Sequence, residues 1–160
     1  HAFAAALEAP RGAVEARPDD SPNLTILPIV TGAAMDKYAF VRRVLDERAY
    51  GAMLANAVTE AAPDLFITCT TPNDVLDVLR ERLPKSLRIV WWLQDIYSVG
   101  IRSVLNRKLP FFGSLVGWIY RGKEKRFARR ADHIVYITPD FLPFLRKLGV
   151  PADKVTVNEN

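Results

Sequence analysis

Short runs of apolar residues alternate along the chain with longer segments in which apolar positions recur at helical spacing. The short runs predict β-strands, and the longer segments predict helices packed against them. Repeated alternation of strand and helix predicts an α/β fold, a Rossmann-like, doubly wound parallel sheet with helices on both faces. The predicted strands are His1–Ala6, Leu24–Val30, Leu65–Thr70, Arg88–Leu93, His133–Ile137 and Val155–Val157.

The longest helical pattern, Asp36–Glu60, is amphipathic. Val41, Leu45 and Ala55 share one face, and Glu47 lies on the opposite, charged face. The spacing therefore predicts a helix that lies on the sheet with its apolar face inward.

Turn residues mark the ends of the other helices. Thr71 and Pro72 combine a capping hydroxyl with a first-turn proline, which predicts a helix from this point to about Leu83. Thr138 starts another helix, and Gly149 is placed to end it. A long helix is also predicted over Gly113–Ala131.

Polar side chains follow three of the predicted strands. Because the carboxyl ends of parallel strands meet at one edge of a sheet, we expect these side chains to line one cleft. Capping is the competing interpretation for Thr71 and Thr138. Asp95 directly follows an apolar run, and a carboxylate buried there needs a partner. The candidate residues are Thr71, Asn73, Gln94, Asp95, Tyr97, Thr138 and Asp140.

The composition fits one domain, residues 1–160, with 49% hydrophobic residues. Its single cysteine, Cys69, lies in an apolar strand, which predicts a buried thiol and fits a reducing cytoplasm. The sequence has no zinc-type Cys/His cluster, no phosphate-binding glycine loop and no serine nucleophile elbow. We therefore predict no metal and no bound cofactor.

Positive charge is concentrated between Asn106 and Arg130, where eight cations face one acid, Glu124. Aromatic residues lie beside them, so this segment is either a solvated helix or a helix that contacts an anionic membrane. Nucleic-acid binding is disfavoured because no reader motif accompanies the charge. The residues predicted to contact a membrane are Phe111, Phe112, Trp118, Lys123, Lys125 and Arg126.

Two stretches carry a family resemblance: "WWLQDIYS", and "RRADHIVYITPDFLPFLRKLGVPADKVTVNEN" at the end of the chain. They resemble the amino-terminal domain of family 4 glycosyltransferases of the GT-B fold. The resemblance implies an enzyme half that holds a glycan or lipid-linked acceptor. Its partner domain would bind a nucleotide-sugar for retaining transfer in cell-surface polysaccharide synthesis. It also implies a catalytic role for Asp95 and substrate contacts for the other carboxyl-edge residues.

Two departures from the family pattern bear on these expectations. Gln94 stands where many members have histidine, so the role of that histidine cannot be transferred. The family's usual first strand would precede His1, so we expect an interruption in the sheet and an inactive fragment. Two other functions stay open: a non-catalytic module that binds a nucleotide or sugar phosphate, and a peripheral membrane-association domain at the inner face of the plasma membrane.

Overall fold

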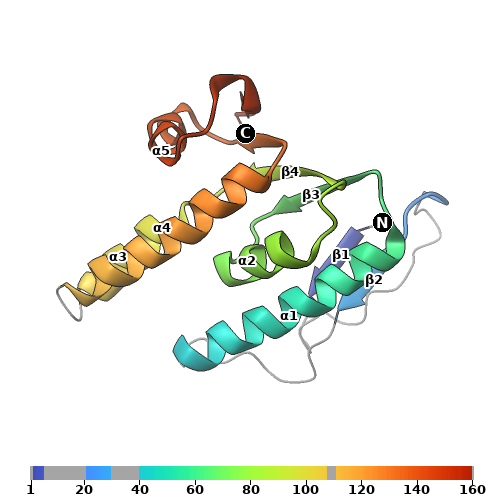
Figure 1. Ribbon diagram of the computed structural model, residues 1–160, viewed down its shortest axis with the longest axis horizontal. Coiled ribbons are helices and arrows are strands. Elements are labelled where there is room, and N and C mark those ends of the chain that lie inside the picture. Colours follow the sequence, from blue (N-terminus) through green and yellow to red (C-terminus); the bar gives the residue numbers. More distant parts are fainter. Residues whose placement is uncertain (1, 6–20, 30–39, 108–110, 160) are drawn as a thin grey trace.

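The computed structural model describes residues 2–5, 21–29, 40–107 and 111–159 (Figure 1). Strands and helices alternate as expected, and the α/β fold class with a parallel sheet flanked by helices is confirmed. The strands are β1 (Ala2–Ala5), β2 (Ile26–Ile29), β3 (Leu65–Cys69), β4 (Arg88–Leu93), β5 (His133–Tyr136) and β6 (Val155–Val157). The α-helices are α1 (Phe40–Ala61), α2 (Asn73–Arg82), α3 (Tyr97–Asn106), α4 (Phe112–Arg130) and α5 (Leu142–Leu148), with short 3-10 turns at Pro139–Phe141 and Ala152–Lys154.

The described strands form two separate parallel sheets. One contains β3, β4, β5 and β6 in that order, and the other is the pair β1–β2. No backbone pairing among the described residues joins the two sheets. β3 is consequently an edge strand of the larger sheet.

One face of the larger sheet carries the core. Register places Thr68 beside Trp91 and Trp91 beside Ile134, and all three are buried. Phe127 of α4 packs edge-on against Trp91, with ring centroids 5.5 Å apart. The helices therefore bury the alternate strand residues whose side chains point to this face.

The opposite face is more open at β3. Leu65 and Ile67 are exposed, and so is Cys69, whose side chain shares their face. The prediction of a buried thiol is therefore wrong. The cause is the alternation of side chains along a strand, since an apolar sequence context does not say which face is covered.

The buried face of α1 differs from the predicted one. Val41 is 72% exposed and Leu45 is 62% exposed, whereas Glu47 is buried. Packing against α2 begins further along the helix, where Leu54 and Val58 enter the core. The first turns of α1 extend beyond this contact, so helical periodicity alone assigned them to the wrong environment.

The helices α3 and α4 form a close antiparallel hairpin, and α3 was not predicted. At Gly113 an added Cβ would lie 2.5 Å from the backbone nitrogen of Asn106, and at Gly117 it would lie 2.8 Å from Cβ of Arg102. The four-residue spacing of these two glycines is the sequence signal that could have revealed the hairpin. At the other end of the chain Gly149 caps α5 in the left-handed region, with φ of 80°, as predicted.

Candidate functional site

The carboxyl ends of β3 and β4 are tied together by side chains. Thr70, whose φ of 49° lies in the left-handed region, donates its hydroxyl to Oε1 of Gln94. The Thr71 hydroxyl lies 2.6 Å from Oγ1 of Thr68 and donates to the Cys69 carbonyl at 3.1 Å. It does not cap α2, which has no side-chain cap, so that prediction is wrong. The hydroxyl is turned back toward β3 and cannot reach the first turn of the helix.

A buried carboxyl joins three helices just behind this edge. Glu124 of α4 is 1% exposed, and its Oε1 accepts from Nδ2 of Asn73 at 3.2 Å and from the Ser98 backbone nitrogen at 2.9 Å. The first contact reaches α2, and the second caps α3, whose own N-cap residue Ile96 offers no side-chain acceptor. Glu124 thus replaces a local cap with one from a distant helix.

The second oxygen of this carboxyl is not satisfied. Neither Oε2 of Glu124 nor Oδ1 of Asn73 has a hydrogen-bond partner among the described residues. Burial raises the pKa of Glu124, although its hydrogen bonds to Ser98 and Asn73 act in the opposite direction. A proton on Oε2 would reduce the cost of keeping this carboxyl out of water.

A second buried acid pairs with α4. Asp74 has no solvent exposure; its Oδ2 accepts from the Tyr120 hydroxyl at 2.6 Å, and its Oδ1 pairs with Nζ of Lys123. The same ammonium lies 4.8 Å from the centre of the Tyr120 ring. Burial and the hydrogen bond to Asp74 raise the pKa of Tyr120. Lys123 is therefore engaged in the interior and is not available to a membrane surface.

A third acid enters from α1. Glu47 is buried, and its Oε1 accepts from Nε of Arg43 at 2.6 Å. Burial raises the pKa of Glu47, the Arg43 pair lowers it, and the charge of Asp74 raises it further. We call this network the carboxyl-edge cluster. It consists of Glu47, Asn73, Asp74, Tyr120, Lys123 and Glu124.

The remaining predicted residues are exposed or half-buried, unlike most of this cluster. Asp95 is exposed and Tyr97 is half-buried, with a pKa raised by burial and then by the charge of Asp95. Thr138 accepts from the Asp140 backbone nitrogen at 3.4 Å, which confirms its capping role, and Asp140 is exposed. Within the described ranges no group of three or more His, Cys, Asp or Glu side chains is placed to hold a metal ion.

The sequence analysis did not predict that the acids of the carboxyl-edge cluster, Glu47, Asp74 and Glu124, are buried structural residues. It found Asn73 but assigned it to a ligand, whereas its amide is buried against Glu124. One signal was available, because Glu124 is the only acid among eight cations between Asn106 and Arg130. A lone acid in such a segment has a specific partner to satisfy.

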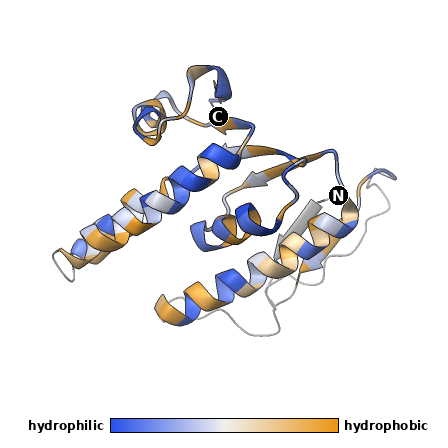
Figure 2. Ribbon diagram, viewed as in Figure 1, coloured by the Kyte–Doolittle hydropathy of each residue, from blue (hydrophilic) through white to orange (hydrophobic). Residues whose placement is uncertain are grey.

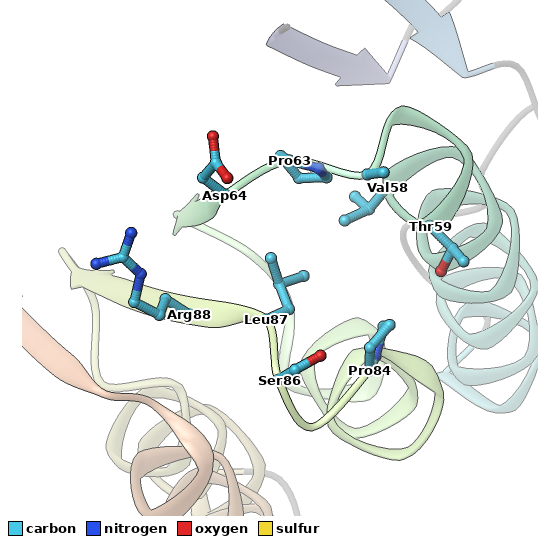
Figure 3. A pocket seen from close by; sticks show the side chains of 9 residues that line it. Val58, Thr59, Pro63, Asp64, Pro84, Ser86, Leu87 and Arg88 are labelled. Atoms are coloured by element: carbon cyan, nitrogen blue, oxygen red, sulfur yellow. The ribbon is translucent and has the colours of Figure 1, made fainter.

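A hollow of about 400 Å³ lies at the opposite, amino edge of the sheet (Figure 3). Val58, Pro63 and Leu87 supply apolar walls, while Asp64 and Arg88 lie at the exposed starts of β3 and β4. Ligands of parallel α/β sheets bind outside the carboxyl ends of the strands. This hollow therefore does not coincide with the predicted cleft.

The hairpin of α3 and α4 displays a mixed apolar and cationic surface. Phe111 is 88% exposed and Trp118 is 72% exposed. Figure 2 shows hydrophobic residues toward the hairpin tip and hydrophilic residues along the last turns of α4. We call this the hairpin surface. It consists of Val104, Phe111, Phe112, Leu115, Trp118, Ile119, Arg121, Lys125 and Arg129, all exposed.

Two predicted membrane cations do not behave alike. Lys125 is exposed and makes no ion pair within the described ranges, whereas Arg126 pairs with Asp77 at 3.2 Å. No helix in the described part of the chain is long and apolar enough to cross a bilayer.

Replacing Glu124 by glutamine should remove part of the pH dependence of stability. A carboxyl whose pKa is raised on folding stabilises the folded protein at low pH. That contribution is lost as pH rises from the unfolded value of about 4.3 through the raised folded pKa. The variant, which cannot ionise, should gain stability relative to wild type across this window, and the difference should level off above it.

Urea denaturation from pH 4 to pH 8 measures this difference. Glu47, whose pKa is raised in the same direction, is present in both proteins, so its contribution cancels. A stability difference that is constant with pH would show that folding does not raise the pKa of Glu124.

No family model matches the chain. Over 99 residues, 61% of this chain, it is 27% identical to ribosomal protein uS12 methylthiotransferase RimO of Acaryochloris marina (strain MBIC 11017). The chain spans about a fifth of the length of this curated relative, since the match covers 21% of it. The relative is named for a function other than sugar transfer, and this finding overturns the predicted glycosyltransferase function. The chain is similar to part of an enzyme, but the glycosyltransferase type has no support.

Proposed function

We propose that this chain is a domain of an enzyme that works at the surface of an anionic membrane, held there by the hairpin surface. The similarity to part of a methylthiotransferase supports the enzymatic part of the proposal. The observation that carries the membrane part is the exposure of Phe111 and Trp118 on the same helical hairpin as Lys125 and Arg129, two exposed cations.

The residues of α4 are ordered along one helical face. Leu115, Trp118, Lys125 and Arg129 share this face at three-, seven- and four-residue spacing, and Phe112 borders it at the tip. The face is apolar near the tip and cationic toward the base. This order suits insertion of the tip into the interface while the cations remain at headgroup level.

The expected free energies of the apolar and ionic contacts favour reversible binding to the membrane. Burial of apolar surface contributes roughly 25 cal/mol per Å², and each cation near an anionic surface contributes about 1 kcal/mol. Charges on a wet surface are screened over about 10 Å at ~0.1 M salt. Binding should therefore require anionic lipid and weaken as salt is added.

Changing Phe111 and Trp118 together to serine should lower the vesicle-bound fraction about tenfold, because the apolar contribution is lost. Changing Lys125 and Arg129 to glutamate should abolish the preference for anionic lipid. Co-sedimentation with phosphatidylglycerol and phosphatidylcholine vesicles at low and high salt measures both effects.

Two control variants match these changes in chemistry but lie elsewhere. Val157→Ser removes an exposed apolar side chain from β6, and the pair Arg146→Glu and Lys147→Glu reverses exposed cations of α5. Both controls should bind vesicles like wild type. Wild-type protein that stays in the supernatant with phosphatidylglycerol at low salt would refute the proposal.

A further inference from the structure

The first turns of α1 point to the same side of the molecule as the hairpin tip. In a parallel α/β unit every crossover helix begins near the carboxyl edge of the sheet, so α1 starts on the side to which α3 and α4 project. Figure 1 shows the start of α1 and the hairpin tip at the same end of the molecule. The rings of Phe40 and Tyr120, 6.5 Å apart, connect the start of α1 to α4 directly.

The first turns of α1 carry apolar side chains that do not pack into the hydrophobic core. Val41 and Leu45 are largely exposed, and both lie outside the core formed by later residues of α1. With Arg48 they form one stripe at four- and three-residue spacing. We call this the α1 surface. It consists of Phe40, Val41, Arg42, Leu45 and Arg48, all exposed.

The charge of the α1 surface has one sign. Arg42 and Arg48 are exposed and make no ion pair within the described ranges. Of the acids in the same turns, Glu47 is buried against Arg43, and Asp46 is half-buried with its Oδ2 out of contact with solvent. Apolar side chains with cations and without an exposed acid match an anionic bilayer better than a mixed-charge protein surface.

We propose that the α1 surface is a second membrane contact, which binds the same anionic bilayer as the hairpin surface. This inference rests on the proposed membrane function and adds the orientation of the domain. Two contacts at the same end of the molecule hold the carboxyl edge, with exposed Asp95, toward the lipid headgroups. Once one contact binds, the second acts at high effective concentration, so weak contacts combine into firm association.

A fluorescent label at position 41 tests the contact in the whole chain. In a Cys69→Ser background, which removes the only native cysteine, Val41→Cys is coupled to an environment-sensitive dye. Phosphatidylglycerol vesicles should shift its emission to the blue, and brominated acyl chains should quench it. The matched control is Met53→Cys, an exposed position three turns further along the same helix, whose label should not respond.

The same experiment separates this inference from the proposal on which it rests. If the dye at position 41 is silent while a dye at Trp118→Cys responds, the α1 contact is refuted and hairpin binding stands. If neither dye responds, both proposals fall. If the dye at position 53 responds as strongly as that at position 41, the binding is not localised and the α1 contact is again refuted.

Removing the apolar side chains gives an independent readout. Val41→Ser combined with Leu45→Ser should lower vesicle partitioning about tenfold while the hairpin surface is intact. Because both side chains are exposed, the thermal unfolding midpoint should not change. Unchanged partitioning would overturn the inference.

Discussion

Replacing Asp74 by alanine should destabilise the protein by about 3–5 kcal/mol, the cost of breaking a buried ion pair by removing one partner. The carboxylate has no solvent exposure, and it satisfies both the Tyr120 hydroxyl and the Lys123 ammonium. Without it the ammonium stays largely buried and uncompensated. Urea denaturation followed by circular dichroism measures the loss, and α4 should detach from α2 before the sheet unfolds.

Asp77 is the matched control for this prediction. It lies on the same helix and pairs with both Arg80 and Arg126, whose side chains remain partly exposed, so that solvent screens these pairs. Asp77→Ala should cost about 1 kcal/mol. Equal losses for the two variants would mean that the buried pair contributes no more than the solvated one.

Replacing Gly113 by alanine should cost about 2 kcal/mol through overpacking of the hairpin. The added methyl group would lie 2.5 Å from both the backbone nitrogen and Oδ1 of Asn106, and 2.9 Å from the Arg102 carbonyl. Two of these contacts are with backbone atoms, so a side-chain rotation cannot relieve them. α3 and α4 must move apart, and the thermal unfolding midpoint should fall.

Gly122 lies nine residues further along the same helix and supplies the control. A Cβ there has only a terminal nitrogen of Arg126 near it, at 3.5 Å. Gly122→Ala should raise stability by about 0.5–1 kcal/mol, because alanine loses less backbone entropy than glycine in a helix. If Gly113→Ala were equally stabilising, the hairpin would not be as closely packed as the distances indicate.

Resemblance of two short stretches to the glycosyltransferase family did not determine the function of this chain. Two stretches resemble that family, but the curated relative is named for a different reaction, and it was this finding that overturned the function. The carboxyl-edge residues Asp95, which is exposed, and Tyr97, which is half-buried, remain candidates for ligand contact. Their chemistry is not set by the resemblance.

Local sequence determined the order of the strands and of the helices other than α3. Alternating apolar runs predicted six strands at the places where they occur, and Gly149 marked the end of α5 because only glycine adopts that backbone conformation readily. The cationic and aromatic segment between Asn106 and Arg130 could also be recognised from the sequence, because its composition does not depend on packing. Within this segment Phe111 and Trp118 are exposed, as the membrane-contact interpretation requires.

Tertiary structure decided which of several similar faces is buried. Helical spacing grouped Val41 with Leu45 correctly, but only the position of α2 left them in solvent and enclosed Glu47. The burial of Asp74 and Glu124 likewise depends on contacts between helices. Asp74 is 46 residues from its partner Tyr120 in the sequence, and Glu124 is 26 residues from its partner Ser98. Periodicity shows which side chains share a face of a helix or strand. The free energy of burying that face depends on the element that packs against it, and the periodicity of a single sequence does not identify that element.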